Sequence, residues 1–393
     1  MPMNFILSDG SVRNNFLPFT FTRPVADIRI GILTLRQKWE KHLNASTSSD
    51  TENYLSEKFP LVEVDKNIKI DASFIPTENL AGIVKNLKEN QAVFYNDYPI
   101  AYFYTKGQEL HWDTFDIIQY THNDILKMEH LWDIFKYNGE AIALDFKLLT
   151  KGRISQPIPE TVHCINKEHI FLEEGASVVL ASLNATEGPI YIGKDAEIME
   201  ACAIRGPFAL CEHATLKMGT KIYGPTTVGP HSKVGGEVTN SVIFGYSNKG
   251  HDGFLGNSVI GEWCNLGADT NNSNLKNNYA EVRLWNYQTG GFTPTGLQFC
   301  GLMMGDHSKC GINTMFNTGT VVGVSANIFG SGFPRNFIPS FSWGGSAGLS
   351  TYKTDKAFEV AKAVMSRRNM EFNEEEAKIL THVFEETAKW RKV

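Results

Sequence analysis

Aliphatic residues recur at every sixth position through the middle of the chain, and small residues follow most of them four places on. An α-helix would need a period of 3.6 residues, and the glycines and prolines between these positions would break it. The six-residue period is typical of a parallel β-helix, in which three hexapeptides form one triangular coil and stacked coils bury a shared apolar stripe. The aliphatic positions of this phase are Ile192, Ile198, Ile204, Leu210, Leu216, Ile222, Val228 and Val234.

The phase of this pattern changes twice further along the chain. A second phase begins at Phe254 and a third at Met304. The interruptions predict two excursions of the chain from the prism, over about residues 235–253 and 271–303. Because insertions in solenoids usually form loops on one face, residues 235–303 become the candidate functional region.

The N-terminal region lacks the hexapeptide period. FILSDG reads as a strand that ends in a glycine turn, and residues 32–43 and 81–90 have helical spacing. Residues 92–103 read as two strands around an Asn-Asp-Tyr-Pro turn, and residues 44–53 as a polar loop. This mixture predicts an α/β domain over residues 1–160.

The C-terminal region again has helical spacing. Residues 355–393 predict two helices, the second with Asn373 as its N-cap, which cover the open end of the β-helix or a neighbouring subunit. The predicted architecture is therefore an α/β domain at 1–160, a β-helix at 161–350 and a helical segment at 351–393.

Composition narrows the class of protein. Apolar residues make up 42% of the 393 residues, charged residues 20%, and the net charge is −6 with the cations dispersed, so no basic face suggests a nucleic-acid partner. The N-terminus lacks the pattern of a signal peptide, and no segment has the roughly 18 consecutive apolar residues of a membrane helix. We expect a cytoplasmic protein whose six cysteines are reduced.

The stretch GHDGFLGNSVIGEWCNLGADTNNSNLK, joined to the hexapeptide array, carries a family resemblance. It resembles the acetyltransferase half of the bifunctional N-acetylglucosamine-1-phosphate uridyltransferase/glucosamine-1-phosphate N-acetyltransferase family, and the chain looks like a short bacterial variant with a divergent nucleotidyltransferase-like α/β domain. The resemblance implies a left-handed parallel β-helix, a homotrimer, and acetyl-CoA bound between adjacent prisms. It also implies acetyl transfer to an amino-sugar 1-phosphate, coupled to a sugar-1-phosphate nucleotidyltransferase that uses a nucleoside triphosphate.

The same resemblance assigns an acetyl-transfer site. His251 stands where the family has its general base, Asn274 where it has an asparagine that contacts acceptor and CoA, and Ala268 where a backbone N–H stabilises the oxyanion. An imidazole can accept the proton of an attacking ammonium at neutral pH, and a preorganised N–H stabilises the tetrahedral intermediate. Phe254 replaces the family's tyrosine, and Lys221 replaces an arginine that grips the sugar phosphate.

Further charged residues are candidates for the acceptor. The sequence makes Glu237 and Lys249 candidate contacts of the amine and the phosphate, and ordinary solvated charges are the alternative. Arg283 is a third candidate substrate contact.

The N-terminal stretch LSDGSVRNNFLPFTFTRPV resembles the phosphate-binding loop of sugar nucleotidyltransferases. The resemblance implies that Gly10, Arg13 and Arg23 bind the nucleotide, although Val12 replaces the family's second glycine. Asp97 resembles the aspartate that holds Mg²⁺ in such enzymes, since hard oxygen ligands suit that ion.

Three alternatives remain open from the sequence. The N-terminal domain can be inactive, which leaves an acetyltransferase alone, or the chain can be a nucleotide-sensing scaffold. A metal enzyme like a γ-type carbonic anhydrase is the third, because His213 and His231 are one 18-residue coil apart.

Overall fold

The computed structural model describes residues 3–391, which form two compact units. The first unit contains most of the chain up to Leu131. The second contains the chain from Trp132 onward together with two short segments, Leu17–Phe21 and Arg29–Ile32. None of the described helices is both long and apolar enough to span a membrane.

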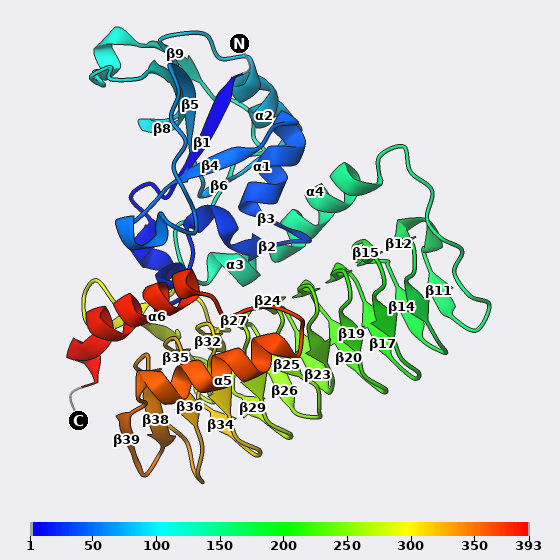
Figure 1. Cartoon of the computed structure of the whole chain (residues 1–393). Helices are drawn as coiled ribbons and strands as arrows, with labels where there is room; N and C mark the ends of the chain where they lie inside the picture. Colours follow the sequence, from blue (N-terminus) through cyan, green and yellow to red (C-terminus); the bar gives the residue numbers. More distant parts are fainter. Residues whose placement is uncertain (1–2, 392–393) are drawn as a thin grey trace. The chain divides into compact units, whose positions relative to one another are not determined.

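The first unit is built on a six-stranded sheet with the order β4-β1-β5-β8-β7-β9 (Figure 1). The strands β4, β1 and β5 at one side of the sheet are parallel, and the antiparallel hairpin of β7 and β8 follows them, as the turn at Asn96 and Asp97 predicted. The helices α1 and α2 lie close to the predicted positions. The bounds are β1 Asn4–Ser8, β4 Thr47–Asp50, β5 Lys66–Asp71, β7 Gln91–Tyr95, β8 Tyr98–Thr105, β9 Asp116–Gln119, α1 Leu35–Leu43 and α2 Glu78–Lys85.

Strand β4 contradicts the predicted polar loop at 44–53. Its sequence TSSD has no apolar residue, yet Ser48 and Ser49 are buried. The Ser48 hydroxyl donates to the Val62 carbonyl oxygen, and the Arg36 guanidinium donates to the Ser49 hydroxyl. Because short hydroxyl side chains can be buried once they are hydrogen-bonded, the strand forms without the alternation that a sequence pattern detects.

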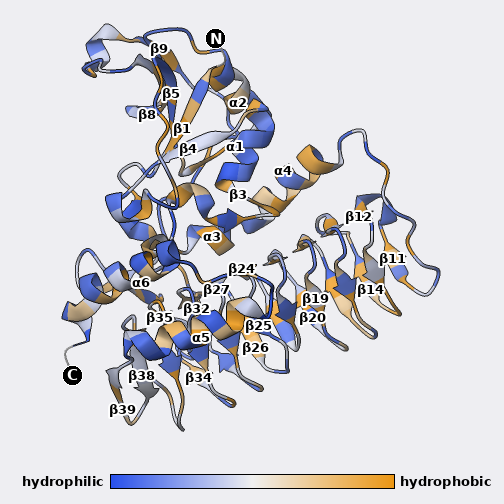
Figure 2. Ribbon diagram, viewed as in Figure 1, coloured by the Kyte–Doolittle hydropathy of each residue, from blue (hydrophilic) through white to orange (hydrophobic). Residues whose placement is uncertain are grey.

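The second unit is a parallel β-helix with three faces (Figure 1). All eight predicted aliphatic positions from Ile192 to Val234 lie in its core. Polar and apolar segments alternate along the coils in Figure 2, as inward and outward positions of a strand require.

Face 1 consists of β11 His163–Ile165, β14 Ser182–Asn184, β17 Ala203–Arg205, β20 Lys221–Tyr223, β23 Glu237–Thr239 and β26 Phe254–Gly256. Face 2 consists of β12 Ile170–Leu172, β15 Ile190–Ile192, β18 Phe208–Leu210, β21 Thr226–Val228, β24 Val242–Gly245, β27 Val259–Glu262, β32 Leu302–Met304, β35 Thr320–Val322 and β37 Phe337–Ile338. Face 3 consists of β13 Ser177–Val178, β16 Glu197–Ile198, β19 Thr215–Leu216, β22 Lys233–Val234, β25 Asn248–Lys249, β28 Asn265–Leu266, β33 Lys309–Cys310, β36 Asn327–Ile328, β38 Ser342–Gly345 and β39 Gly348–Thr351.

The predicted excursion at 235–253 is wrong. This segment contributes β23, β24 and β25, one strand to each face. The phase changes because the coil is shorter: Leu216 and its register partner Val234 are 18 residues apart, whereas Val234 and Lys249 are 15 apart. The same shift makes Leu255 the inward residue of β26 and leaves Phe254 half-buried outside the core.

The second predicted excursion is confirmed. Val259 of β27 pairs with Met303 of β32, so 44 residues separate two neighbouring strands of face 2. The intervening chain forms β28 of face 3, then β29 (Asn271–Asn272) and a hairpin of β30 (Arg283–Asn286) and β31 (Gly291–Pro294).

Helices cover parts of the prism. α3 (Asp133–Lys136) and α4 (Asn138–Thr150) belong to the second unit, and α4 packs on β18 and β21 of face 2. The two predicted C-terminal helices are α5 (Thr354–Ser366) and α6 (Glu374–Glu386), and Asn373 is the N-cap of α6 as expected. α5 lies on face 3 over β33 and β36, while Phe384 of α6 packs on Phe341 near the last coil.

Candidate functional site

His251 lies in a turn of the corner where face 3 passes to face 1, here called the glycine corner. The glycine corner comprises the stacked turns 235–236, 250–253 and 267–270, each between a strand of face 3 and the strand that follows it. The His251 side chain is exposed. Gly253 in the same turn has φ +118, and a Cβ there would overlap the Thr270 carbonyl oxygen of the next turn. The turn that carries the imidazole is therefore packed tightly against its neighbour.

Ala268 lies in the next turn of the glycine corner. The Asp269 N–H donates to the Asp252 carbonyl oxygen (3.0 Å), which joins this turn to that of His251. The Ala268 carbonyl oxygen accepts from the Asn313 N–H (2.8 Å), while the Ala268 N–H donates to no group among residues 3–391. This N–H is available to an oxygen of a bound ligand, as the oxyanion assignment needs.

Asparagines of the second coil are bonded to the coil of His251. Asn271 accepts from the Phe254 N–H (2.8 Å) and Asn272 from the Gly256 N–H (2.9 Å) through their side-chain oxygens. The Asn274 amide donates to Asn257 Oδ1 (2.8 Å). The structure thus brings His251, Ala268 and Asn274 onto two successive coils. Sequence reasoning missed Asn257, Asn271 and Asn272, for which the asparagine-rich run NNSN was the available signal.

Lys221, Glu237 and Phe254 form a row on face 1. They occupy paired positions of the neighbouring strands β20, β23 and β26. Lys221 Nζ lies 3.8 Å from Glu237 Oε2, and the Tyr223 hydroxyl donates to Glu237 Oε1 (2.6 Å). This hydrogen bond raises the pKa of Tyr223 to about 12. The two predicted charges therefore form a pair of an exposed lysine and a half-buried glutamate, with Tyr223 as a further member that the sequence did not single out.

Lys249 does not lie at the surface, where a contact with the substrate phosphate was predicted for it. Its side chain is buried, and Nζ donates to the carbonyl oxygens of Gly235 and His251 (2.9 Å each). An amine held inside the prism is not available to a substrate phosphate at the surface, so that expectation is wrong. Arg283 lies in the hairpin of the insertion, where its guanidinium donates to the Phe292 carbonyl oxygen of the opposite strand.

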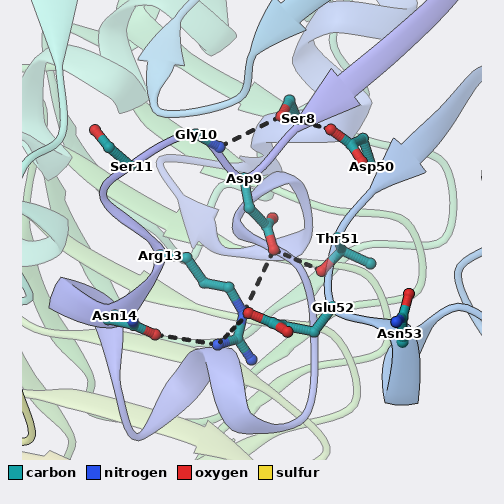
Figure 3. A pocket seen from close by; sticks show the side chains of 10 residues that line it. All are labelled: Ser8, Asp9, Gly10, Ser11, Arg13, Asn14, Asp50, Thr51, Glu52 and Asn53. Carbon is teal, nitrogen blue, oxygen red and sulfur yellow. Dashed lines mark hydrogen bonds and ion pairs between the residues drawn. The ribbon is translucent and has the colours of Figure 1, made fainter.

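The first unit contains a pocket of about 320 Å³ where the phosphate-binding loop was predicted (Figure 3). Gly10 and Arg13 both line it, and Gly10 adopts φ +59 in the turn after β1. Arg23 is buried and Asp97 is exposed in the turn between β7 and β8, and neither residue lines the pocket. The full lining is Ser8, Asp9, Gly10, Ser11, Arg13, Asn14, Asp50, Thr51, Glu52 and Asn53.

Carboxylates dominate the charge of this pocket. Arg13 Nε lies 3.5 Å from Asp9 Oδ2, and Arg13 Nη1 lies 3.6 Å from Glu52 Oε1. Burial raises the pKa of Asp9 to about 6, against hydrogen bonds from the Thr51 hydroxyl and the Val25 N–H. The pocket therefore presents one arginine that is already close to carboxylates.

His213 and His231 stack one coil apart, as their spacing predicted, with ring centroids 4.8 Å apart. The stack continues through Tyr246 (4.9 Å) and Trp263 (4.3 Å) along the corner where face 2 passes to face 3, here called the aromatic corner. Burial, followed by the neighbouring His213, lowers the pKa of His231. In the described part of the chain no three His, Cys, Asp or Glu side chains form a group that could hold a metal ion. The column of rings is thus explained by side-chain packing.

Comparison with known proteins found one family model and several similar proteins. Residues 5–154 match a family model described as sugar nucleotidyl transferase. The chain is 31% identical over 227 residues to a bifunctional sugar-1-phosphate nucleotidylyltransferase/acetyltransferase of Sulfurisphaera tokodaii; the match covers 50% of this chain and 56% of that protein's length. Among solved structures, an Arabidopsis UDP-N-acetylglucosamine acyltransferase matches with a TM-score of 0.25 and 14% identity, over 54% of this chain and 80% of that one.

Proposed function

We propose that the protein is an acetyl-CoA-dependent N-acetyltransferase of an amino-sugar 1-phosphate, joined to a sugar-1-phosphate nucleotidyltransferase. One observation carries the first part: the turn of His251 is hydrogen-bonded to the turn of Ala268, whose N–H makes no hydrogen bond within residues 3–391, and Asn274 lies on the same second coil. The similarity to a protein named for both activities supports the pairing.

In the proposed reaction His251 accepts a proton from the attacking amine. The amine then adds to the thioester carbonyl, and the negative charge that develops on its oxygen is stabilised by the Ala268 N–H. The intermediate collapses as the C–S bond breaks, the leaving CoA thiolate takes up the proton that His251 accepted, and no acyl-enzyme is needed. Asn274, whose amide is held by Asn257, orients the reactants, and binding both of them side by side replaces a bimolecular encounter. Assembly as a homotrimer, with acetyl-CoA between adjacent prisms, belongs to this proposal.

The proposed nucleotidyl transfer uses the pocket of the first unit. Gly10 and Arg13 are the groups that line it and suit nucleotide phosphates. Mg²⁺ would be held here by one or two carboxylates of the lining together with the nucleotide phosphates, whose charge it would neutralise. Asp97 and Arg23 are not among the residues that line this pocket. If the pocket is inactive, the chain is an acetyltransferase alone.

The test of acetyl transfer measures CoA release with glucosamine 1-phosphate as acceptor. His251→Ala should lower kcat about 10²–10⁴-fold, the usual contribution of a general base. His213→Ala is the matched control, because that histidine is also exposed on the prism but lies on the aromatic corner. Undiminished acetyl transfer by His251→Ala would remove the proposed base. Release of pyrophosphate from UTP or dTTP with a sugar 1-phosphate and Mg²⁺ tests the first unit.

A further inference from the structure

A lysine occupies a position that every neighbouring coil fills with an apolar side chain. On face 3, Leu216 pairs with Val234 and Val234 with Lys249, so Lys249 continues their inward column. Leu266 and Cys310 follow it on the same face, and all of these apolar neighbours belong to the core. Lys249 itself is only 3% exposed.

The Lys249 ammonium joins two stacked turns of the glycine corner. Nζ donates to the Gly235 carbonyl oxygen of one turn and to the His251 carbonyl oxygen of the next, both at 2.9 Å. The turns are in close contact, because a Cβ on Gly235 would lie 2.9 Å from the Gly250 carbonyl oxygen. The amine therefore fixes the backbone of the residue that carries the imidazole.

The buried charge is costly. An aliphatic side chain would continue the column without desolvating an ammonium, which loses several kcal/mol of hydration on burial unless it is paired. The groups that face the amine are the carboxylates of Asp252 and Asp269 and the thiol of Cys310. Burial outweighs them and lowers the pKa of Lys249 to about 8. Perturbed ionisable groups of this kind concentrate at functional sites.

We propose that Lys249 is a positioning residue, whose charged amine holds the carbonyl group of His251 and thereby orients the imidazole for proton transfer. The inference rests on the proposed function of His251. A neutral amine donates weaker hydrogen bonds than an ammonium, so the turn is held less firmly once Lys249 loses its proton. The proposed reaction should consequently have an alkaline limit near pH 8 that belongs to the scaffold and not to the substrates.

The matched control lies on the same face. Lys309 is half-buried and desolvation also lowers its pKa to about 8, but its amine donates to the carbonyl oxygens of His307 (2.9 Å) and Trp263 (3.4 Å) at the aromatic corner. Lys309 thus makes hydrogen bonds of the same kind as Lys249 but does not touch the turn of His251.

The experiment compares Lys249→Met, Lys249→Gln and Lys309→Met in the full-length protein, with kcat and KM for acetyl transfer measured from pH 6 to 10. Lys249→Met should lower kcat about 10–100-fold with little change in either KM, because a misplacement of about 1 Å can cost 10²-fold. Its alkaline limit near pH 8 should also be lost, whereas Lys309→Met should keep the wild-type profile.

The outcomes separate the two proposals. If His251→Ala retains acetyl transfer, the proposed base fails, whatever Lys249 does. If His251→Ala is inactive while both Lys249 variants match Lys309→Met in kcat and profile, the positioning role is overturned. Should Lys249→Met not fold, Lys249→Gln and the wild-type profile decide: a wild-type kcat that does not fall above pH 8 contradicts the inference.

Discussion

The Asp269 N–H donates a hydrogen bond to the carbonyl oxygen of Asp252 and so links two turns of the β-helix. The first of these turns carries His251 and the second carries Ala268. Because stacked strands lie about 4.8 Å apart, the backbones of the proposed base and of the proposed oxyanion donor are neighbours on adjacent coils.

Gly253→Ala should disturb this link. The residue has φ +118, and a Cβ would overlap the Thr270 carbonyl oxygen, so we expect a loss of at least about 2 kcal/mol of unfolding free energy and a drop in acetyl transfer. Gly250→Ala in the same turn is the control, because nothing lies within 4 Å of its Cβ position. Chemical denaturation of both variants measures the effect, and equal stability of the two would contradict the packing described for this corner.

Asn274→Ala should lower kcat/KM for acetyl transfer about 10–100-fold, since its amide is held by Asn257 Oδ1 on the coil of His251. Asn277→Ala provides the comparison, as this exposed asparagine belongs to the same insertion. Steady-state kinetics with acetyl-CoA and glucosamine 1-phosphate give the result. A similar loss in both variants would point to the insertion as a whole and not to Asn274.

Asp9→Asn should stabilise the first unit at neutral pH. Because burial raises the pKa of Asp9 to about 6, the folded state holds more protons than the unfolded chain between about pH 4 and 6, and its stability falls as the pH rises through that window. Asp9→Asn has no such charge to bury, so above pH 6 its free energy of unfolding should exceed that of the wild type by up to about 3 kcal/mol. This advantage should vanish below pH 4. Thermal unfolding across pH 4–7 checks the sign; an advantage that grows on acidification would refute it.

The lowered pKa of Lys249 predicts how the stability of the protein changes with pH. Its pKa is lowered from 10.5 to about 8, so the folded state holds fewer protons than the unfolded chain between these values, and stability rises with pH there. Relative to Lys249→Met, the wild type should gain up to about 3 kcal/mol from pH 8 to 10.5. Lys309 contributes equally to both proteins, so the difference in urea denaturation reports Lys249 alone. A difference that stays flat with pH speaks against a charged amine in the core.

The sequence predicted those parts of the fold that rest on a long, regular pattern. The residues from Ile192 to Val234 point into the core as the period requires, and Asn373 caps its helix. The prediction failed where the coil changes length: Leu255, not Phe254, faces inward, because a phase shift in the sequence looks the same for a shortened coil and for a loop.

The candidate site was predictable only in part. His251 and Asn274 come from a recognisable motif, but the buried position of Lys249 depends on the register of the shortened coil. The carboxylates around Arg13 were also missed, since Asp50 and Glu52 lie in and just after a strand, β4, that has no apolar residue to mark it. Both failures concern polar residues whose partners are distant in the sequence, Gly235 for Lys249 and Arg13 for Glu52.

The contraction of the coil at Val234–Lys249 means that this solenoid forms one part of its candidate site by removing residues, while the insertion that carries Asn274 supplies another. A coil with fewer residues has a shorter corner, and glycines at that corner allow the backbones of stacked turns to come into contact. The position of a side chain on such a corner is more restricted than that of a side chain on a long loop. Deletions at other corners of hexapeptide solenoids are therefore places where new rigid sites can arise without any inserted loop.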